Sequence, residues 1–296
     1  MTDLTTLDFD SIKSNLKNYL KEQSIFQDYD FEGSNISVLL DVLAYNSYLN
    51  GFYLNMLGSE MFLDSAQLRD SVISHTKELN YLPRSFRSAT ASVNLTIIDS
   101  VASSVIIPRG TSFTGTAGNR NFTFVTGENV VAKSGSGENE FIVSDVNLYE
   151  GDYVSDSFVV NTADKAQRFT LSNKTIDVTS LLVAVMEDNG SNLKSYKRVD
   201  SLFGLGSASE VFFIQPTNND RYEIVFGDGV IGRKPKNRAI VTIQYRACNG
   251  ELPNGIAIFT ADGKVGTSLI TNVTVNETAK GGAISESLDS IKYNAP

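Results

Sequence analysis

The stretch YLPRSFRSATASVNLTII, residues 81–98, is where the hydrophobic pattern of this chain changes its period. Before Pro83 the apolar residues recur with the spacing of a helix. After Pro83 the period becomes two, so that Val93, Leu95 and Ile97 share one face of a strand and polar residues occupy the other. The chain is therefore predicted to have an α+β fold.

Applied to the whole chain, this change of pattern predicts three regions. Residues 1–83 are predicted to be an N-terminal α-helical arm, and residues 84–280 a mainly antiparallel all-β region, either one elaborated domain or two small ones. Residues 281–296 are predicted to start a further C-terminal region that is absent from this chain, with a helical pattern from Ser285 to Ala295.

Three helices are predicted in the arm. The first runs from Asp8 to about Gln23, and the second begins at Asn35 with Ser34 as its N-cap. The third is predicted over Ser65–Asn80, with Asp64 or Ser65 as its cap.

The second helix is apolar around most of its circumference. Between Ile36 and Phe62 it carries thirteen apolar residues, too many for one buried stripe. Two short neighbouring helices cannot cover such a surface over its whole length. We expect this arm to pack against helices of another chain, although a self-contained three-helix bundle is the alternative.

Composition excludes several classes of function. The net charge of −9 argues against non-specific binding of nucleic acid, and no window approaches the roughly 18 unbroken apolar residues of a membrane span. The single cysteine, Cys248, rules out an intrachain disulfide and a cysteine-based metal site. The N-terminal sequence MTDLTTLDFD lacks the basic and apolar regions of a secretory signal, so synthesis in the cytoplasm is expected.

The segment FGDGVIGRKP, Phe226–Pro235, matches the glycine-rich loop of dinucleotide-binding proteins. Such a loop needs a helix directly after it, but Pro235 and a new alternating strand from Ala239 follow instead. The favoured interpretation is a wide β-hairpin connection in which glycines adopt positive φ and an aspartate binds backbone N–H groups. Its structural residues are predicted to be Gly227, Asp228, Gly229, Gly232 and Pro235.

No group of residues supports catalysis. His75 is the only histidine and is expected on a helix surface or interface, so neither a catalytic triad nor a zinc or iron site is predicted. The cluster Asp28, Asp30 and Glu32 lacks the spacing of a calcium loop and is interpreted as a polar turn. The chain is predicted not to be an enzyme and to bind no cofactor, metal or small-molecule substrate.

One group of basic residues is interpreted as the solvent-exposed tip of the predicted hairpin, with contact to an acidic partner surface as the alternative. These residues are Arg233, Lys234, Lys236 and Arg238.

Several motifs carry a family resemblance. DYDFEGSNISVLLDVLAYNSYLNGFYLN and LRDSVISHTKELNYLPRS resemble the N-terminal arm of the baseplate wedge proteins of contractile-tailed phages. IPRGTSFTG, NFTFVT, FGDGVIGRKP, VTIQYRACNGELPN and GGAISESLDSIKYNAP resemble signatures of the wider baseplate J-like family, in which the FGDG segment belongs to a hairpin and binds no nucleotide. The motifs occur in family order and span nearly the whole chain.

The resemblance implies a structural protein of the tail baseplate in the virion. It implies that a second copy and a larger wedge partner join through N-terminal helices, and that the wedges form a ring around the tail tube that rearranges on sheath contraction. The alternatives are a subunit of a phage-like contractile injection system or, with less support, a receptor- or carbohydrate-binding β protein. The residues expected to form the partner-binding seam are Leu39, Leu43, Tyr48, Phe52 and Met56.

Overall fold

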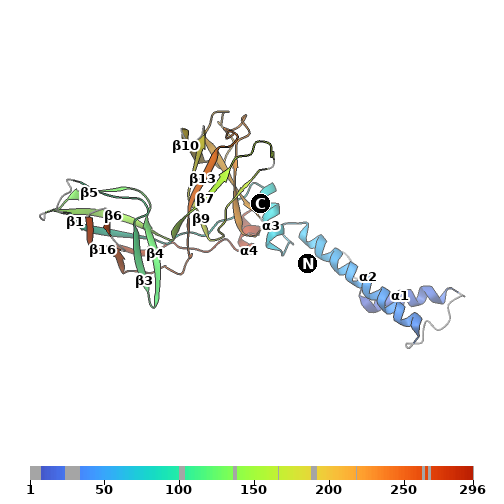
Figure 1. The fold of residues 1–296 in the computed structure, drawn as a ribbon. Helices are drawn as coiled ribbons and strands as arrows, with labels where there is room; N and C mark the ends of the chain where they lie inside the picture. The colour runs from blue at the N-terminus through green and yellow to red at the C-terminus, as the bar shows by residue number, and fades with distance from the viewer. Residues whose placement is uncertain are drawn as a thin grey trace. The chain divides into compact units, whose positions relative to one another are not determined.

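The computed structural model describes residues 8–23, 34–99, 104–135, 139–165, 167–187, 192–217, 219–261, 264–265 and 268–295 (Figure 1). The chain divides into two compact units. The helical unit contains Met1–Tyr81 and Leu288–Pro296, and the β unit contains Leu82–Ser287. The predicted fold class, helices followed by a mainly antiparallel β region, is confirmed. The predicted polar turn at Asp28, Asp30 and Glu32 lies outside the described residues.

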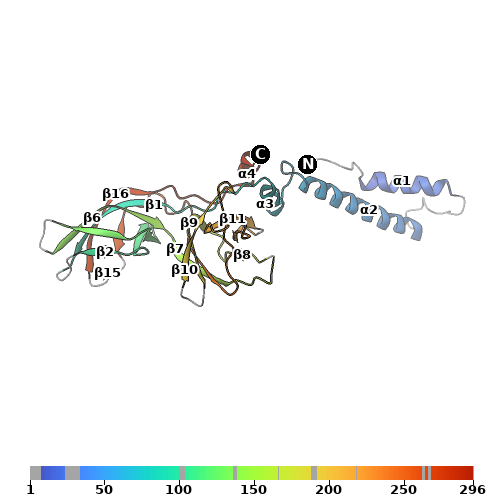
Figure 2. The same cartoon turned by 90° about the horizontal axis from the view of Figure 1, so that it is seen from above.

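Two helices lie alongside each other in the helical unit (Figures 1 and 2). Helix α1 (Phe9–Lys21) begins after Asp8, whose carboxylate accepts the N–H of Ser11 at 2.8 Å. Helix α2 (Asn35–Glu60) begins after Ser34, as predicted, and the Ser34 hydroxyl accepts the N–H of Ser37 at 3.0 Å. In each case a side-chain oxygen satisfies a backbone donor that the first helical turn leaves free.

The third helix starts later than the sequence predicted. Helix α3 spans Arg69–Glu78, and its N-cap is Leu68, which supplies no side-chain hydrogen bond. The capping group comes instead from the end of α2, where the Glu60 carboxylate accepts the N–H of Gln67 at 2.8 Å and that of Leu68. Ser65 is not a cap because its hydroxyl bonds the carbonyl of Ser59. A capping carboxylate from another helix leaves no local sequence signal.

A short C-terminal helix completes the helical unit. Helix α4 (Leu288–Asn294) lies within the predicted helical pattern Ser285–Ala295. Its Ile291 is fully buried in a small apolar cluster with Ala66 and Val72. This cluster joins α4 to α3 and to the turn before it.

In the described part of the β unit the strands form two sheets (Figures 1 and 2). The first sheet consists of β1 (Thr90–Ile98), β2 (Val105–Ile107), β3 (Ser112–Ala117), β4 (Arg120–Thr126), β5 (Val130–Ser134), β6 (Glu140–Glu150), β14 (Phe259–Ala261), β15 (Lys264–Val265) and β16 (Ser268–Lys280). The second sheet consists of β7 (Asp152–Val159), β8 (Phe169–Thr170), β9 (Ile176–Glu187), β10 (Asn192–Arg198), β11 (Val211–Thr217), β12 (Arg221–Phe226) and β13 (Ile240–Ala247).

The second sheet is inserted in the chain between the strands of the first. The chain forms β1 to β6, then β7 to β13, and returns to the first sheet with β14 to β16. Each sheet has its own apolar core. The strand predicted from the opening stretch is β1, and its Val93, Leu95 and Ile97 are fully buried in the first core, as the alternating pattern predicted. Among the described strands, β10 and β11 make the one parallel pairing.

A buried salt bridge joins two neighbouring strands of the second sheet. Arg246 on β13 forms a salt bridge with Asp177 on β9 at 3.2 Å, and both side chains are buried. Burial alone would raise the pKa of Asp177, but hydrogen bonds from Thr179 and Ser88 and the charge of Arg246 together lower that pKa. The opposite charges of Arg246 and Asp177 thus compensate each other inside the protein.

Glu150, the last residue of β6, supplies a pH-dependent contribution to stability. It is fully buried, and burial raises its pKa above the ordinary value of 4.5 despite hydrogen bonds from Asn249. A raised pKa favours the folded state below the unfolded pKa, and this contribution is lost as pH rises through the folded pKa. We predict that Glu150→Gln is more favourable relative to wild type at neutral pH than near pH 4.5. Urea unfolding at both pH values measures this difference, and a difference that does not change with pH would contradict the prediction.

Candidate partner-binding surface

Helix α2 is covered on only one side within its own unit. Its buried residues are Ser37, Leu40, Ala44 and Ser59. On α1 the buried residue is Ile12, and Lys13 forms a salt bridge with Asp41 of α2 at 2.5 Å. Helix α1 therefore fixes one narrow stripe of α2 and leaves most of its circumference to solvent.

All five residues predicted to form the seam are exposed in the single chain. The exposed fractions are Leu39 62%, Leu43 53%, Tyr48 38%, Phe52 49% and Met56 37%. Single exposed apolar residues are common on soluble proteins, whereas a contiguous apolar surface marks an interaction site. Further large apolar residues of the same helix and its C-terminal end are also exposed: Val38, Val42, Tyr45, Tyr53, Leu54, Leu57, Met61 and Phe62.

The five predicted residues do not lie on one line of the helix. At about 100° per residue, Leu39 and Leu43 lie on one side and Tyr48, Phe52 and Met56 on another. Phe52 and Met56 belong to a series spaced alternately by four and three residues, the heptad spacing of helices that pack along their length. That series is Val38, Val42, Tyr45, Leu49, Phe52 and Met56, of which all but the half-buried Leu49 are exposed.

Four members of this series were not among the predicted seam residues: Val38, Val42, Tyr45 and Leu49. The four-three spacing was visible in the sequence and could have identified them. Two exposed apolar sides on one helix are suited to a bundle in which α2 contacts more than one other helix.

The glycine-rich segment after β12 is a tightly bonded turn. Asp228 Oδ1 accepts the N–H groups of Val230 and Ile231 at 2.8 and 2.9 Å, and these bonds lower the pKa of Asp228. Gly229 and Gly232 have φ values of +96° and +80°, which side-chain-bearing residues rarely adopt. Gly227 packs against Gly232, and a Cβ atom on Gly227 would lie 2.3 Å from the Gly232 carbonyl. Pro235 is buried just beyond the turn.

This segment is not the hairpin connection that the sequence predicted. Strand β12 pairs with β11 and β8, whereas β13 pairs with β7 and β9. The chain therefore crosses from one part of the second sheet to another. Its backbone bonds go to a neighbouring loop, with Gly232 N donating to Gly206 O at 3.1 Å and Arg233 N donating to Ser209 O at 2.7 Å. Strand patterns identify strands, but they do not identify which strands pair.

Two of the four clustered basic residues are held by an internal carboxylate. Arg233 Nη2 lies 2.8 Å from Glu187 Oε2, and Lys236 Nζ lies 3.9 Å from the same atom. The Glu187 side chain is fully buried, and its hydrogen bond raises the pKa of Arg233. The favoured prediction of a solvated tip is therefore wrong for Arg233, because its partner is supplied by β9, far away in the sequence, whereas the Lys236 side chain is 54% exposed.

The chain has one histidine, whose ring contacts the backbone, and one cysteine, which is buried. His75 Nε2 lies 2.9 Å from the carbonyl oxygen of Glu60 at the end of α2. Burial raises the pKa of the Cys248 thiol to about 11, which disfavours the nucleophilic thiolate. Among the described residues, no group of three or more His, Cys, Asp or Glu side chains could hold a metal ion. None of the helices in the described part combines the length and apolar character that crossing a bilayer requires.

Two regions of the chain match models of known protein families. Residues 8–81 match the family model "Baseplate wedge protein gp6-like, helical domain", and residues 88–151 match "Baseplate wedge protein gp6, domain II". The chain is 30% identical over 286 residues to "Baseplate wedge protein gp6" of Enterobacteria phage T4. This alignment covers 90% of the chain and 41% of the relative.

A solved structure is also similar along the chain. It is the "Cryo-EM structure of the anti-feeding prophage (AFP) baseplate", 11% identical, covering 99% of this chain and 52% of that chain with a TM-score of 0.33. A TM-score this low does not establish a shared fold.

Proposed function

The chain contains regions related to the helical domain and domain II of gp6-like baseplate wedge proteins, and on that premise we propose that it is a structural, non-enzymatic subunit of a phage tail baseplate. It spans 41% of the length of its curated relative, so this role concerns the part of a wedge protein that is present here. The proposed location is the baseplate of the virion, after synthesis in the host cytoplasm.

The observation that carries the proposal is the exposed apolar surface of α2. A helix that stayed in solvent would leave the roughly half-exposed side chains of Leu39, Leu43 and Phe52 in contact with water, at a cost of about 1–1.5 kcal/mol each relative to full burial. Association with other helices removes that cost. We propose that the partners are α2 of a second copy and a helix of a larger wedge protein, which together form a bundle.

The wider assembly follows as part of the same proposal. Wedges joined through this bundle close into a ring around the tail tube, and the ring rearranges when the sheath contracts. The bundle is the element expected to hold subunits together during that change, because its contacts are apolar and lie along a whole helix.

Sedimentation of the full chain tests the partner bundle. We predict association that depends on concentration in the micromolar range, because α2 has no cover of its own on most of its surface. Circular dichroism on the same samples reports whether the arm remains helical. A stable monomer with a well-folded helical arm would refute the bundle, whereas electron cryomicroscopy of the intact particle tests the ring.

A further inference from the structure

A strongly hydrogen-bonded turn of the first sheet holds an arginine in a fixed place. The turn follows β2 and belongs to the IPRGTSFTG motif, whose role the proposed function leaves unexplained. The Pro108 carbonyl accepts the hydroxyl groups of Thr111 and Thr126, both at 2.7 Å. Arg109 N donates to Asn129 Oδ1 at 2.8 Å. These bonds fix the backbone from which the Arg109 side chain extends.

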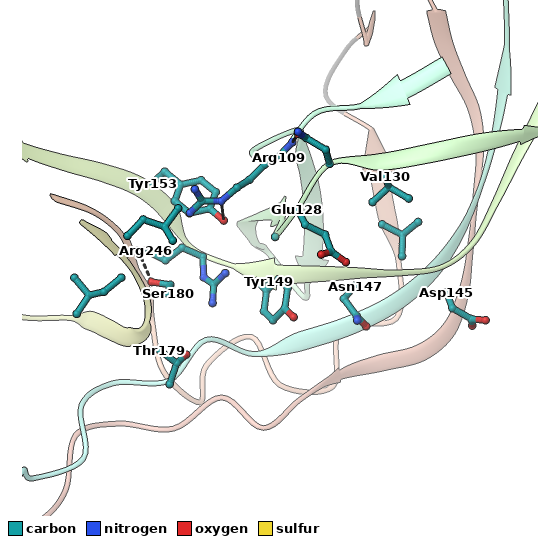
Figure 3. Close-up of a pocket in the computed structure, with 15 residues that line it drawn as sticks. Arg109, Glu128, Val130, Asp145, Asn147, Tyr149, Tyr153, Thr179, Ser180 and Arg246 are labelled. Carbon is teal, nitrogen blue, oxygen red and sulfur yellow. Dashed lines mark hydrogen bonds between the residues drawn. The ribbon is translucent and has the colours of Figure 1, made fainter. Parts of the chain in front are cut away.

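The side chain of Arg109 is itself oriented by the second sheet. Figure 3 shows Arg109 beside Tyr153. The guanidinium lies 4.3 Å from the centroid of the Tyr153 ring, and Nε donates to the Tyr153 hydroxyl at 3.0 Å. Nη1 donates to Gln244 Oε1 at 2.9 Å. A guanidinium has five N–H donors, so three remain for other partners. In the described part of the chain no carboxylate forms a salt bridge with it.

Arg109 lines a pocket of about 580 Å³ between the two sheets (Figure 3). A second arginine at this pocket, Arg246, is already neutralised by Asp177 and stacks on Tyr149 at 4.3 Å. Arg109 is therefore the cation available to a ligand. Because it is held rigidly, it loses less side-chain entropy when it binds than a free surface arginine does.

The other charges at the pocket restrict the class of ligand. Glu128 and Asp145 are exposed and also line it. They repel a polyphosphate or nucleic acid, which carries several negative charges, more strongly than a single carboxylate. A planar carboxylate can take two parallel N–H bonds from a guanidinium.

We propose that this pocket binds one acidic side chain, presented by a segment of another protein chain. The site lies in the β unit and is separate from α2. Its test needs no assembled particle, so this proposal and the proposed function can fail independently.

The test follows the Arg109 Nε–H signal by nuclear magnetic resonance in the full chain, with Arg109→Lys used to assign it. The probes are acetyl-Gly-Glu-Gly-amide, the matched acetyl-Gly-Gln-Gly-amide and inorganic phosphate. We expect a saturable shift with the glutamate peptide and none with the glutamine peptide. Gln244→Glu supplies Arg109 with an internal carboxylate and is expected to weaken binding about tenfold.

Glu128→Gln is the second variant, because it removes a repelling charge at an exposed position. It is expected to tighten binding about twofold to threefold. Equal shifts with both peptides, or no saturable shift, would show that Arg109 only braces the two sheets. Tighter binding of phosphate than of the glutamate peptide would identify a site for small anions and would also overturn the proposal.

Discussion

Replacement of Leu43 or Phe52 by glutamate is expected to weaken association of this chain by about a hundredfold or more. Both residues are exposed in the single chain, and in the proposed bundle they become buried. A carboxylate left without a partner in an apolar interface costs several kcal/mol, and each 1.4 kcal/mol is a tenfold change in affinity. Sedimentation equilibrium measures the dissociation constant directly.

The two positions test different sides of α2. Leu43 lies beside Leu39, and Phe52 belongs to the series that ends at Met56. If only Phe52→Glu weakens association, the bundle uses the heptad series alone and the seam assignment of Leu39 and Leu43 is wrong. If neither does, the partner is not bound through α2.

A matched control for these variants is Ser14→Glu on α1, where the side chain is exposed and polar. It adds the same charge to the same unit and is expected to leave association unchanged. The β unit should remain folded in all three variants, because its two cores contain no residue of α1 or α2.

Gly227→Ala is expected to destabilise the β unit by about 3 kcal/mol or more. The added Cβ atom would lie 2.3 Å from the carbonyl carbon and oxygen of Gly232, so the backbone of the turn must move. That turn also carries the bond from Gly232 N to Gly206 O. Urea unfolding followed by tyrosine fluorescence gives the change in the free energy of unfolding.

Two neighbouring glycines provide graded controls for this substitution. Gly229→Ala adds an atom with room around it but at positive φ, for an expected cost of about 1–2 kcal/mol. Gly206→Ala has open space and ordinary φ and is expected to change stability by less than about 0.5 kcal/mol. Equal costs at all three positions would contradict close packing at Gly227. A nucleotide that raised the unfolding midpoint would revive the phosphate-loop interpretation of this segment.

The helix α2 and the strand β1 illustrate what local sequence patterns predict well. The apolar residues of β1 alternate, and the buried residues alternate with them, because successive side chains of a strand point to opposite faces. The start of α2 was predictable from Ser34, which bonds the backbone within the same turn. Both signals come from residues within a few positions of one another.

Other features depend on groups that are distant in the sequence, and local patterns could not predict them. The cap of α3 comes from Glu60, and the partner of Arg233 is the buried Glu187. The guanidinium of Arg109 is oriented by Tyr153 and Gln244 from another sheet. A charged or polar residue in a sequence shows that a partner is needed but does not show which residue will supply it.

The succession of helices and strands and the excess of apolar residues on α2 could be predicted from the amino-acid sequence, because periodicity and residue type are properties of each element. The three-dimensional structure was needed to establish which strands pair, that the segment after β12 crosses the second sheet, and that α1 covers just one stripe of α2. Those outcomes depend on which of several compatible surfaces meet, and the free energy of such contacts is shared between residues far apart in the chain.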